Sequence, residues 1–402
     1  MNLQKNLLSL VFVVCCGLLA GCGGGQQQST VVSVPSLASV SVVNQVPLDG
    51  SLYGHNMAVS GCTAYVTMQN NLALSKLAVV NLCGAGTVAS AAPVLVSKTA
   101  GSYAAMNGIA VNGPYLYVTY DWATNPFEVW SAGTNLSPPA LLSCLPLFSD
   151  NGYTTCAAAA SGYGALLGSN PTVIGSDVYV AENSDDKGQA VQVLSVANPA
   201  LPVRQAYPAG ITAGVSTGGS TLAGLWAVGS GSTLYVGTVD GSSASDQPVT
   251  ITAYSAATNA LTPAQLGVPL NIPAGYFIQS MAVQGTTVVA TLTDSAIASS
   301  KILVASFSNP AAPTMAMIAP TAGCVFESQN FIAVQNGYAF VGCGMSPGIE
   351  VVQFSTASAP VLVGQAGATL TGVNFLALEG SYLYAVDLEG NLDTLLVGTT
   401  FQ

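Results

Sequence analysis

A short strand-forming segment centred on one large residue recurs seven times along this chain. The centre is usually aromatic, as in Leu-Tyr-Val-Thr at 116–119. The seven anchor residues, separated by 44 to 62 positions, are Tyr65, Tyr117, Tyr179, Tyr235, Val289, Phe340 and Tyr384. A repeat of about fifty residues built only of strand pattern is typical of blades arranged around an axis. The sequence therefore predicts a β-propeller.

The second repeat shows the internal order of a blade. It has apolar segments at 109–111, 115–120, 127–131 and 140–144, and residues typical of turns separate them. Four short strands joined in this way form one blade. Outside the N-terminal segment, no stretch has sustained helical periodicity, so the predicted fold class is all-β.

The last repeat supplies only three strand segments, at 374–378, 382–388 and 393–398. Residues 39–46 have strand pattern and precede the first inner strand. We expect this segment to complete the last blade, because ring closure removes two open sheet edges that would otherwise invite aggregation. The prediction is a seven-bladed β-propeller closed by an N-terminal strand and occupying residues 38–402.

Several repeats place an Asn-Pro or Ala-Pro turn between two strand-forming runs. The clearest examples are at 191–205, 302–318 and 349–364. This pattern resembles the LVIVD repeat over most of the chain, although the usual Asp of the turn is absent. The resemblance implies a propeller and implies almost nothing about chemistry.

The N-terminal segment has the features of a targeting signal. Lys5 precedes an apolar run at 7–19 that is too short for an ordinary membrane span, and Leu19-Ala20-Gly21-Cys22 follows. This order resembles a bacterial lipoprotein signal, which implies cleavage before Cys22 and a lipid on its sulfur. Residues 1–21 are then a signal peptide, and 22–37 are a flexible tether rich in Gly and Gln. The alternative is an ordinary secretory signal with an incidental cysteine.

The same resemblance carries an expectation about location. Gly23, rather than Asp, follows the lipidated cysteine. In a two-membrane cell this implies anchoring at the outer membrane or the cell surface. The expected contact with the membrane is therefore the lipid anchor itself.

Charge excludes one class of partner. The chain has 6 Lys and Arg residues against 17 Asp and Glu, and only 6% of its residues are charged. Binding to nucleic acid requires clustered Lys and Arg that neutralise phosphates, so we expect no nucleic-acid partner. The remaining partners are a protein, a peptide or a glycan, and we expect a monomer.

Six of the nine cysteines lie beyond the signal and the lipidation site. An even number in an exported protein indicates disulfides. When the strands of each blade are numbered outwards from the axis, both members of each proposed pair fall on the same face of the ring. The predicted disulfides are Cys62–Cys83, Cys144–Cys156 and Cys324–Cys343. The alternative is free buried thiols.

Two sets of polar residues are predicted on what we call the upper face, where second strands end and first strands begin. The first set precedes the centres of the first strands: His55, Asn107, Asn170, Gly224, Gln279, Asn330 and Asn374. The second set follows the second strands: Gln69, Asp121, Glu182, Asp240, Asp294 and Asp387. Carboxylate and amide oxygens suit a hard cation such as calcium, and they also suit a polyhydroxylated ligand. The alternative is that Asn and Asp form Asx turns at strand ends.

The sequence offers little for catalysis. His55 is the only histidine, and neither a GxSxG nor an HExxH motif is present. We therefore predict no catalytic residues and favour a binding or interaction module at the cell envelope. The alternatives are a metal-assisted hydrolase or lactonase that uses the upper-face acids and amides with His55, and a purely structural envelope component. Insertions at 146–169 and 205–225 are candidate recognition loops on the same face.

Overall fold

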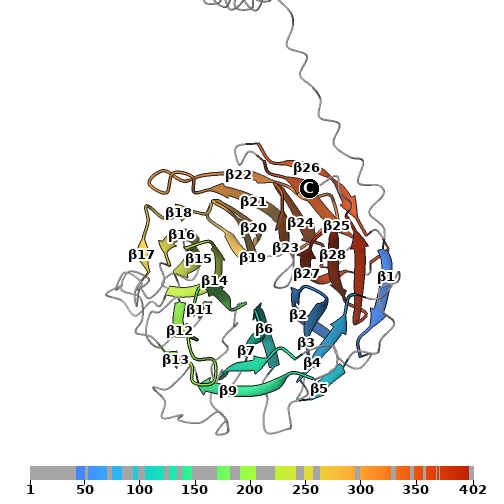
Figure 1. Ribbon diagram of the computed structural model, residues 1–402. Helices are drawn as coiled ribbons and strands as arrows, with labels where there is room; N and C mark the ends of the chain where they lie inside the picture. Colours follow the sequence, from blue (N-terminus) through green and yellow to red (C-terminus); the bar gives the residue numbers. More distant parts are fainter. Residues whose placement is uncertain are drawn as a thin grey trace, which may run out of the picture. The chain divides into compact units, whose positions relative to one another are not determined.

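In a computed structural model, the β-sheets of the protein are arranged in a ring around a central axis (Figure 1). The described part of the chain contains no helix long and apolar enough to cross a membrane. The residues that the structure describes are 42–49, 53–69, 75–83, 94–97, 105–121, 126–133, 138–146, 170–181, 191–204, 222–240, 249–256, 263–294, 299–326, 332–344, 348–355, 359–367, 369–370 and 372–397.

Seven sheets form the ring, and their strands run outwards in chain order, as the repeat predicted. The first blade contains β2 (Tyr53–Ser60), β3 (Thr63–Gln69), β4 (Ser75–Asn81) and β5 (Val94–Ser97). The second contains β6 (Ala105–Asn112), β7 (Tyr115–Asp121), β8 (Pro126–Ser131) and β9 (Ala140–Pro146). The third contains β10 (Thr172–Ile174), β11 (Asp177–Ala181), β12 (Val191–Ser195) and β13 (Val203–Arg204).

The next three blades follow the same order. The fourth blade contains β14 (Leu222–Ser230), β15 (Thr233–Asp240), β16 (Val249–Ser255) and β17 (Ala264–Gln265), and β18 (Leu270–Asn271) also pairs with β16. The fifth contains β19 (Tyr276–Gln284), β20 (Thr287–Asp294), β21 (Ser300–Ser306) and β22 (Thr314–Ile318). The sixth contains β23 (Ile332–Gln335), β24 (Tyr338–Gly342), β25 (Ile349–Gln353) and β26 (Val361–Ala366).

The seventh blade joins the two ends of the ring. Its inner strands are β27 (Val373–Glu379), β28 (Tyr382–Asp387) and β29 (Asn391–Leu396), and its outer strand is β1 (Val42–Pro47). β1 pairs antiparallel with β29, and the Leu48 amide adds a 3.0 Å hydrogen bond to the Gly390 carbonyl. The predicted closure by an N-terminal strand is confirmed.

The hydrophobic core lies between neighbouring blades, and each of the seven interfaces has its own cluster of buried side chains. All seven anchor residues are buried. Tyr179 of the third blade, for example, packs with Leu234 and Val236 of the fourth. The anchors recur in the sequence because every blade must cover the next with a large apolar side chain.

The Asn-Pro turns connect blades as well as strands. In the turn at Asn309, the side-chain Oδ1 accepts a 3.2 Å hydrogen bond from the Ala311 amide. The Pro310 carbonyl then accepts a 3.0 Å hydrogen bond from Val268 of the preceding blade. A Cβ atom on Gly267 would lie 1.9 Å from that carbonyl oxygen, so only glycine permits this approach. The turn at Asn309 therefore joins the fifth blade to the fourth.

Candidate functional site

The first strands of four blades bulge at the residue that the sequence placed in the first polar set. The pairing register shifts around His55, Asn107, Gln279 and Asn374. In the fourth blade the shift surrounds Leu225, one residue beyond the predicted Gly224. A bulge bends its strand and redirects the extra side chain, and bulges are enriched at barrel rims and near functional sites.

Strand pairing places both predicted sets at the same end of the blades. Tyr276 at the start of β19 is opposite Asp294 at the end of β20. Likewise, Val373 at the start of β27 is opposite Asp387 at the end of β28. The bulges are therefore close to the ends of the second strands, on the upper face.

Side chains from different blades meet around this end of the channel. The Asn56 Nδ2 group donates to Asn170 Oδ1, although a whole blade separates these residues in the ring. Asn56 is fully buried, and its own Oδ1 accepts a 2.8 Å hydrogen bond from the Met57 amide. Asn374 Nδ2 donates to the Gly54 carbonyl at 3.2 Å, which links the last blade to the first.

Asn56 was not predicted, because the repeat alignment selected its neighbour His55. The register shift between Gly54 and Asn56 falls at His55 and places Asn56 opposite Thr67. Within the fifth blade, Gln279 Nε2 donates to Thr293 Oγ1 at 2.8 Å. We call His55, Asn56, Asn107, Asn170, Gln279 and Asn374 the bulge ring.

Asp387 has a different surrounding from the bulge ring. Its Oδ1 accepts a 2.8 Å hydrogen bond from the Asn391 amide, and its Oδ2 accepts one of 2.9 Å from Asn391 Nδ2. The residue is buried in the tight turn between β28 and β29. This is the turn geometry that the sequence left open as the alternative for such residues. We therefore interpret Asp387 as a turn residue and do not include it in the candidate site.

Several predicted positions cannot be placed at the level of side chains. Glu182 and Asn330 lie outside the described residues, as do 147–169 and 205–221 of the two insertions. For Gln69, Asn107, Asp121 and Asp240 the structure describes the strand position and not the side chain.

Two of the three predicted disulfides are confirmed. Cys62 is bonded to Cys83, and Cys324 is bonded to Cys343. Cys144 is also disulfide-bonded, and its predicted partner Cys156 lies outside the described residues. The first disulfide joins the turn between β2 and β3 to the segment that follows β4, and the second joins the segment before β23 to the residue that follows β24.

Buried polar side chains occupy one position of the third strand in five blades, a feature that the sequence interpretation missed. The position directly precedes the cross-strand partner of the anchor, and its polar occupants are Glu128, Gln192, Thr252, Glu350 and Asp393. In the second blade, Glu128 accepts hydrogen bonds from Tyr120 and, at 3.1 Å, from Trp130 Nε1. The available signal was an acidic residue inside an otherwise apolar strand.

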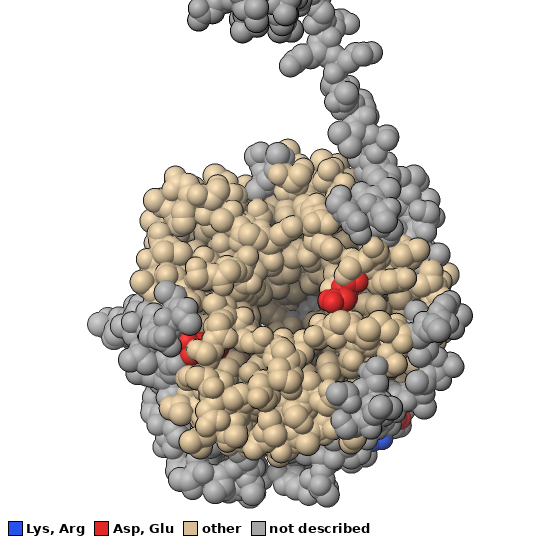
Figure 2. Space-filling view, viewed as in Figure 1, with Lys and Arg blue, Asp and Glu red and all other residues tan. Residues whose placement is uncertain are grey.

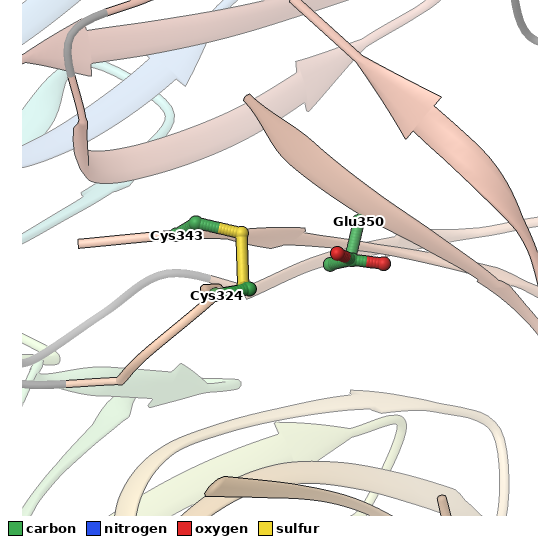
Figure 3. Close-up of side chains that lie close together, drawn as sticks. All are labelled: Cys324, Cys343 and Glu350. Carbon is green, nitrogen blue, oxygen red and sulfur yellow. A yellow bond between two sulfur atoms is a disulfide. The ribbon is translucent and has the colours of Figure 1, made fainter. Parts of the chain in front are cut away.

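Glu350 lies beside the disulfide of Cys324 and Cys343 (Figure 3), and their ligand atoms are within 4.8 Å of one another. Because the two sulfurs are bonded to each other, neither is a thiolate that could bind a metal. The Glu350 carboxylate instead accepts hydrogen bonds from Thr321 and, at 2.9 Å, from Gln365 Nε2. This group is therefore a structural part of the sixth blade.

The space-filling view shows a hollow at the centre of the ring (Figure 2). Most of the described surface in this view is uncharged, and Asp or Glu atoms lie beside the hollow. This distribution agrees with the low proportion of charged residues, 6% of the chain.

Comparison with known proteins gives no functional assignment. No family model and no curated protein sequence matches the chain. Among solved structures, the chain is similar to the computationally designed Ika8 protein, with 11% identity and a TM-score of 0.49 over 89% of this chain and 99% of the other. It is similar to Saccharomyces cerevisiae Sqt1 with 10% identity and a TM-score of 0.49 over 89% and 98% of the two chains. The propeller assignment rests on the strand order described above.

Proposed function

We propose that this protein is a binding module whose ligand contacts the partly exposed residues of the bulge ring, which include His55, Gln279 and Asn374. The observation that supports this most strongly is that the four predicted polar residues His55, Asn107, Gln279 and Asn374 are all at bulges of inner strands. A bulge interrupts the strand ladder and so weakens the sheet locally. Its recurrence with polar side chains at the same end of the ring favours a role in recognition.

The chemistry of the bulge ring favours an uncharged polar ligand. An amide side chain both donates and accepts hydrogen bonds, whereas it has no charge to balance an ion. Five of the six residues in the bulge ring are amides and the sixth is His55. Such groups suit sugar hydroxyls and peptide groups, so we propose a glycan, a peptide or a protein segment as ligand.

The location is proposed from the N-terminal segment. Residues 1–41 lie outside the described residues, so the proposal rests on the resemblance of 19–22 to a lipoprotein signal. We propose that Cys22 carries lipid and holds the propeller at the outer membrane or the cell surface. The disulfides agree with an oxidising compartment.

Binding can be tested with single Asn→Ala substitutions on opposite ends of the same fold. Asn374 belongs to the bulge ring, whereas Asn112 is exposed in the hairpin turn at the other end of the second blade. The purified protein is titrated with envelope polysaccharide and with solubilised envelope proteins. We expect Asn374→Ala to weaken binding about 5- to 10-fold, because a lost hydrogen bond costs about 1 kcal/mol.

Asn112→Ala should bind like the wild type. Equal weakening by both variants, or by neither, would argue against the bulge ring as the binding site. Calcium-dependent hydrolysis of a lactone that Asp294→Ala abolishes would instead support the metal-assisted hydrolase. The absence of saturable binding to either material would favour a structural envelope component.

The anchor proposal has its own test. We expect Cys22→Ser to move the protein from the membrane fraction to the soluble fraction of the cell envelope, because one thiol carries the lipid. The measurement is fractionation of cells that express each form, followed by immunoblotting. Retention of the variant in membranes would contradict lipidation at Cys22.

A further inference from the structure

Asp393 has a position in the closing blade that the binding proposal does not use. It is fully buried in the middle of β29, and its cross-strand neighbour on β1 is the exposed Gln45. Gln45 Nε2 donates a 3.0 Å hydrogen bond to Asp393 Oδ1. No N–H or hydroxyl group in the described part of the chain donates a hydrogen bond to the other carboxylate oxygen, Oδ2.

The surroundings of Asp393 include a second acid. Asp393 is opposite Ala385 on β28 and lies on the side of the blade that packs against the apolar residues of the sixth blade. Asp387, at the end of β28, is 2% exposed and interacts with the Asp393 side chain. Two buried carboxylates can form a hydrogen bond with each other only when one of them is protonated.

We propose that the ring closure contains a proton-dependent latch, in which Asp393 and Asp387 share one proton while β1 is in place on β29. The Oδ2 hydroxyl of protonated Asp393 donates to the Asp387 carboxylate, and Oδ1 accepts from Gln45. When the proton leaves, two buried negative charges face each other beneath the closing strand. Release of β1 then lets water reach Asp393, which lowers the cost of its charge.

Electrostatics agrees with this assignment. Burial, followed by the negative charges of Asp387 and Glu389, raises the pKa of Asp393 to about 7, although the hydrogen bond from Gln45 lowers it. Asp387 on β28 and Glu389 in the following turn are the charged groups that act on Asp393, and β1 contributes the neutral Gln45. The neighbouring surface of the sixth blade contributes Ala366 and Leu370, which do not titrate.

The direction of the pH effect follows from these values. The unfolded chain releases this proton near its ordinary pKa of 3.8, whereas the closed ring holds it up to about pH 7. The contribution of Asp393 to stability is therefore fully present below about pH 4. It declines as the pH rises towards 7, and the closed ring loses the shared proton above that value.

Hydrogen exchange of the β1 amides tests the latch in the full-length protein. Protection factors, corrected for the intrinsic pH dependence of exchange, are compared at pH 6 and pH 8 for β1 and for β22, the outer strand of the fifth blade. We expect β1 to lose about tenfold in protection at pH 8, one unit above the pKa, while β22 changes little. In Asp393→Asn, an uncharged isostere that keeps an acceptor for Gln45, β1 should keep its protection at pH 8.

Glu389→Gln is the matched control, because it removes an exposed acid two residues from Asp387 and leaves the shared proton in place. It should lose protection as the wild type does. The proposal would be overturned if wild-type β1 were protected at pH 8 as well as or better than at pH 6. It would also be overturned if β1 of the Asp393→Asn variant still lost protection at pH 8. If Asp393→Asn does not fold, the wild-type comparison of β1 with β22 decides alone.

Discussion

A chain that lacks residues 1–48 is expected to be strongly destabilised, because it loses the outer strand of the seventh blade. Val46 and Leu48 are buried against the last and first blades, and β1 covers the edge of β29. Removing two such side chains from a core costs about 3–6 kcal/mol, before the lost strand pairing is counted. The measurement is the midpoint of urea unfolding followed by tryptophan fluorescence.

A shorter deletion provides the control. A chain that lacks residues 1–37 keeps β1 and should unfold at the same urea concentration as the chain without its signal peptide. If the 1–48 deletion were equally stable, the N-terminal strand would not close the ring in solution. If both deletions were unstable, the segment before β1 would contribute to folding in a way that the strand order does not explain.

Replacement of Tyr179 by Ala is expected to cost about 3–5 kcal/mol in unfolding free energy, the usual range for a large buried aromatic residue. The side chain is 0% exposed and packs against the inner strands of the fourth blade. Its loss therefore leaves a cavity between two blades. The measurement is the change in the free energy of unfolding from urea titrations of the variant and the wild type.

Two further variants separate packing from polarity at this anchor. The Tyr179 hydroxyl has no hydrogen-bond partner in the described part of the chain, and burial, followed by the nearby Asp177, raises the pKa of Tyr179 to about 12. Tyr179→Phe should therefore change stability by less than about 1 kcal/mol. Tyr382→Ala, at a residue that is 40% exposed, should cost much less than Tyr179→Ala. Similar costs for Tyr179 and Tyr382 would contradict the role of the anchors.

The blades can be predicted from the sequence because each anchor residue has the same role, which is to fill the space between two neighbouring blades. Tyr117 and Tyr235 are 118 residues apart in the chain, and each fills the space between two blades. A requirement repeated seven times leaves a visible period, and closure follows from counting the strands of the last blade. Disulfides were predictable for a related reason, because strand order fixes which face of the ring each cysteine occupies.

The candidate site was only partly predictable. Its residues could be found by alignment of the repeats, but the bulge that redirects their side chains depends on pairing between two strands. The fourth blade shows the difference, since its bulge falls at Leu225 and not at Gly224. The contact of Asn56 with Asn170 could not be predicted from the sequence either, because it depends on the curvature of the whole ring.

The buried acids of the third strands were missed for a different reason. Within one strand, Glu128 or Asp393 has the appearance of a residue on the exposed face. Only the tertiary structure shows that these side chains are buried, and that Trp130 or Gln45 of the same blade supplies a hydrogen-bond donor. A polar residue in the same place in several strands is the pattern that would have indicated a shared buried position.

The most direct test of the binding proposal is a hydrogen-exchange footprint of the wild-type protein with and without saturating envelope polysaccharide or envelope proteins. The account predicts added protection at the starts of the inner strands, at 53–57, 105–109, 276–280 and 373–375. Protection confined to the hairpins at the other end of the blades, at 112–115, 284–287, 335–338 and 379–382, would contradict it.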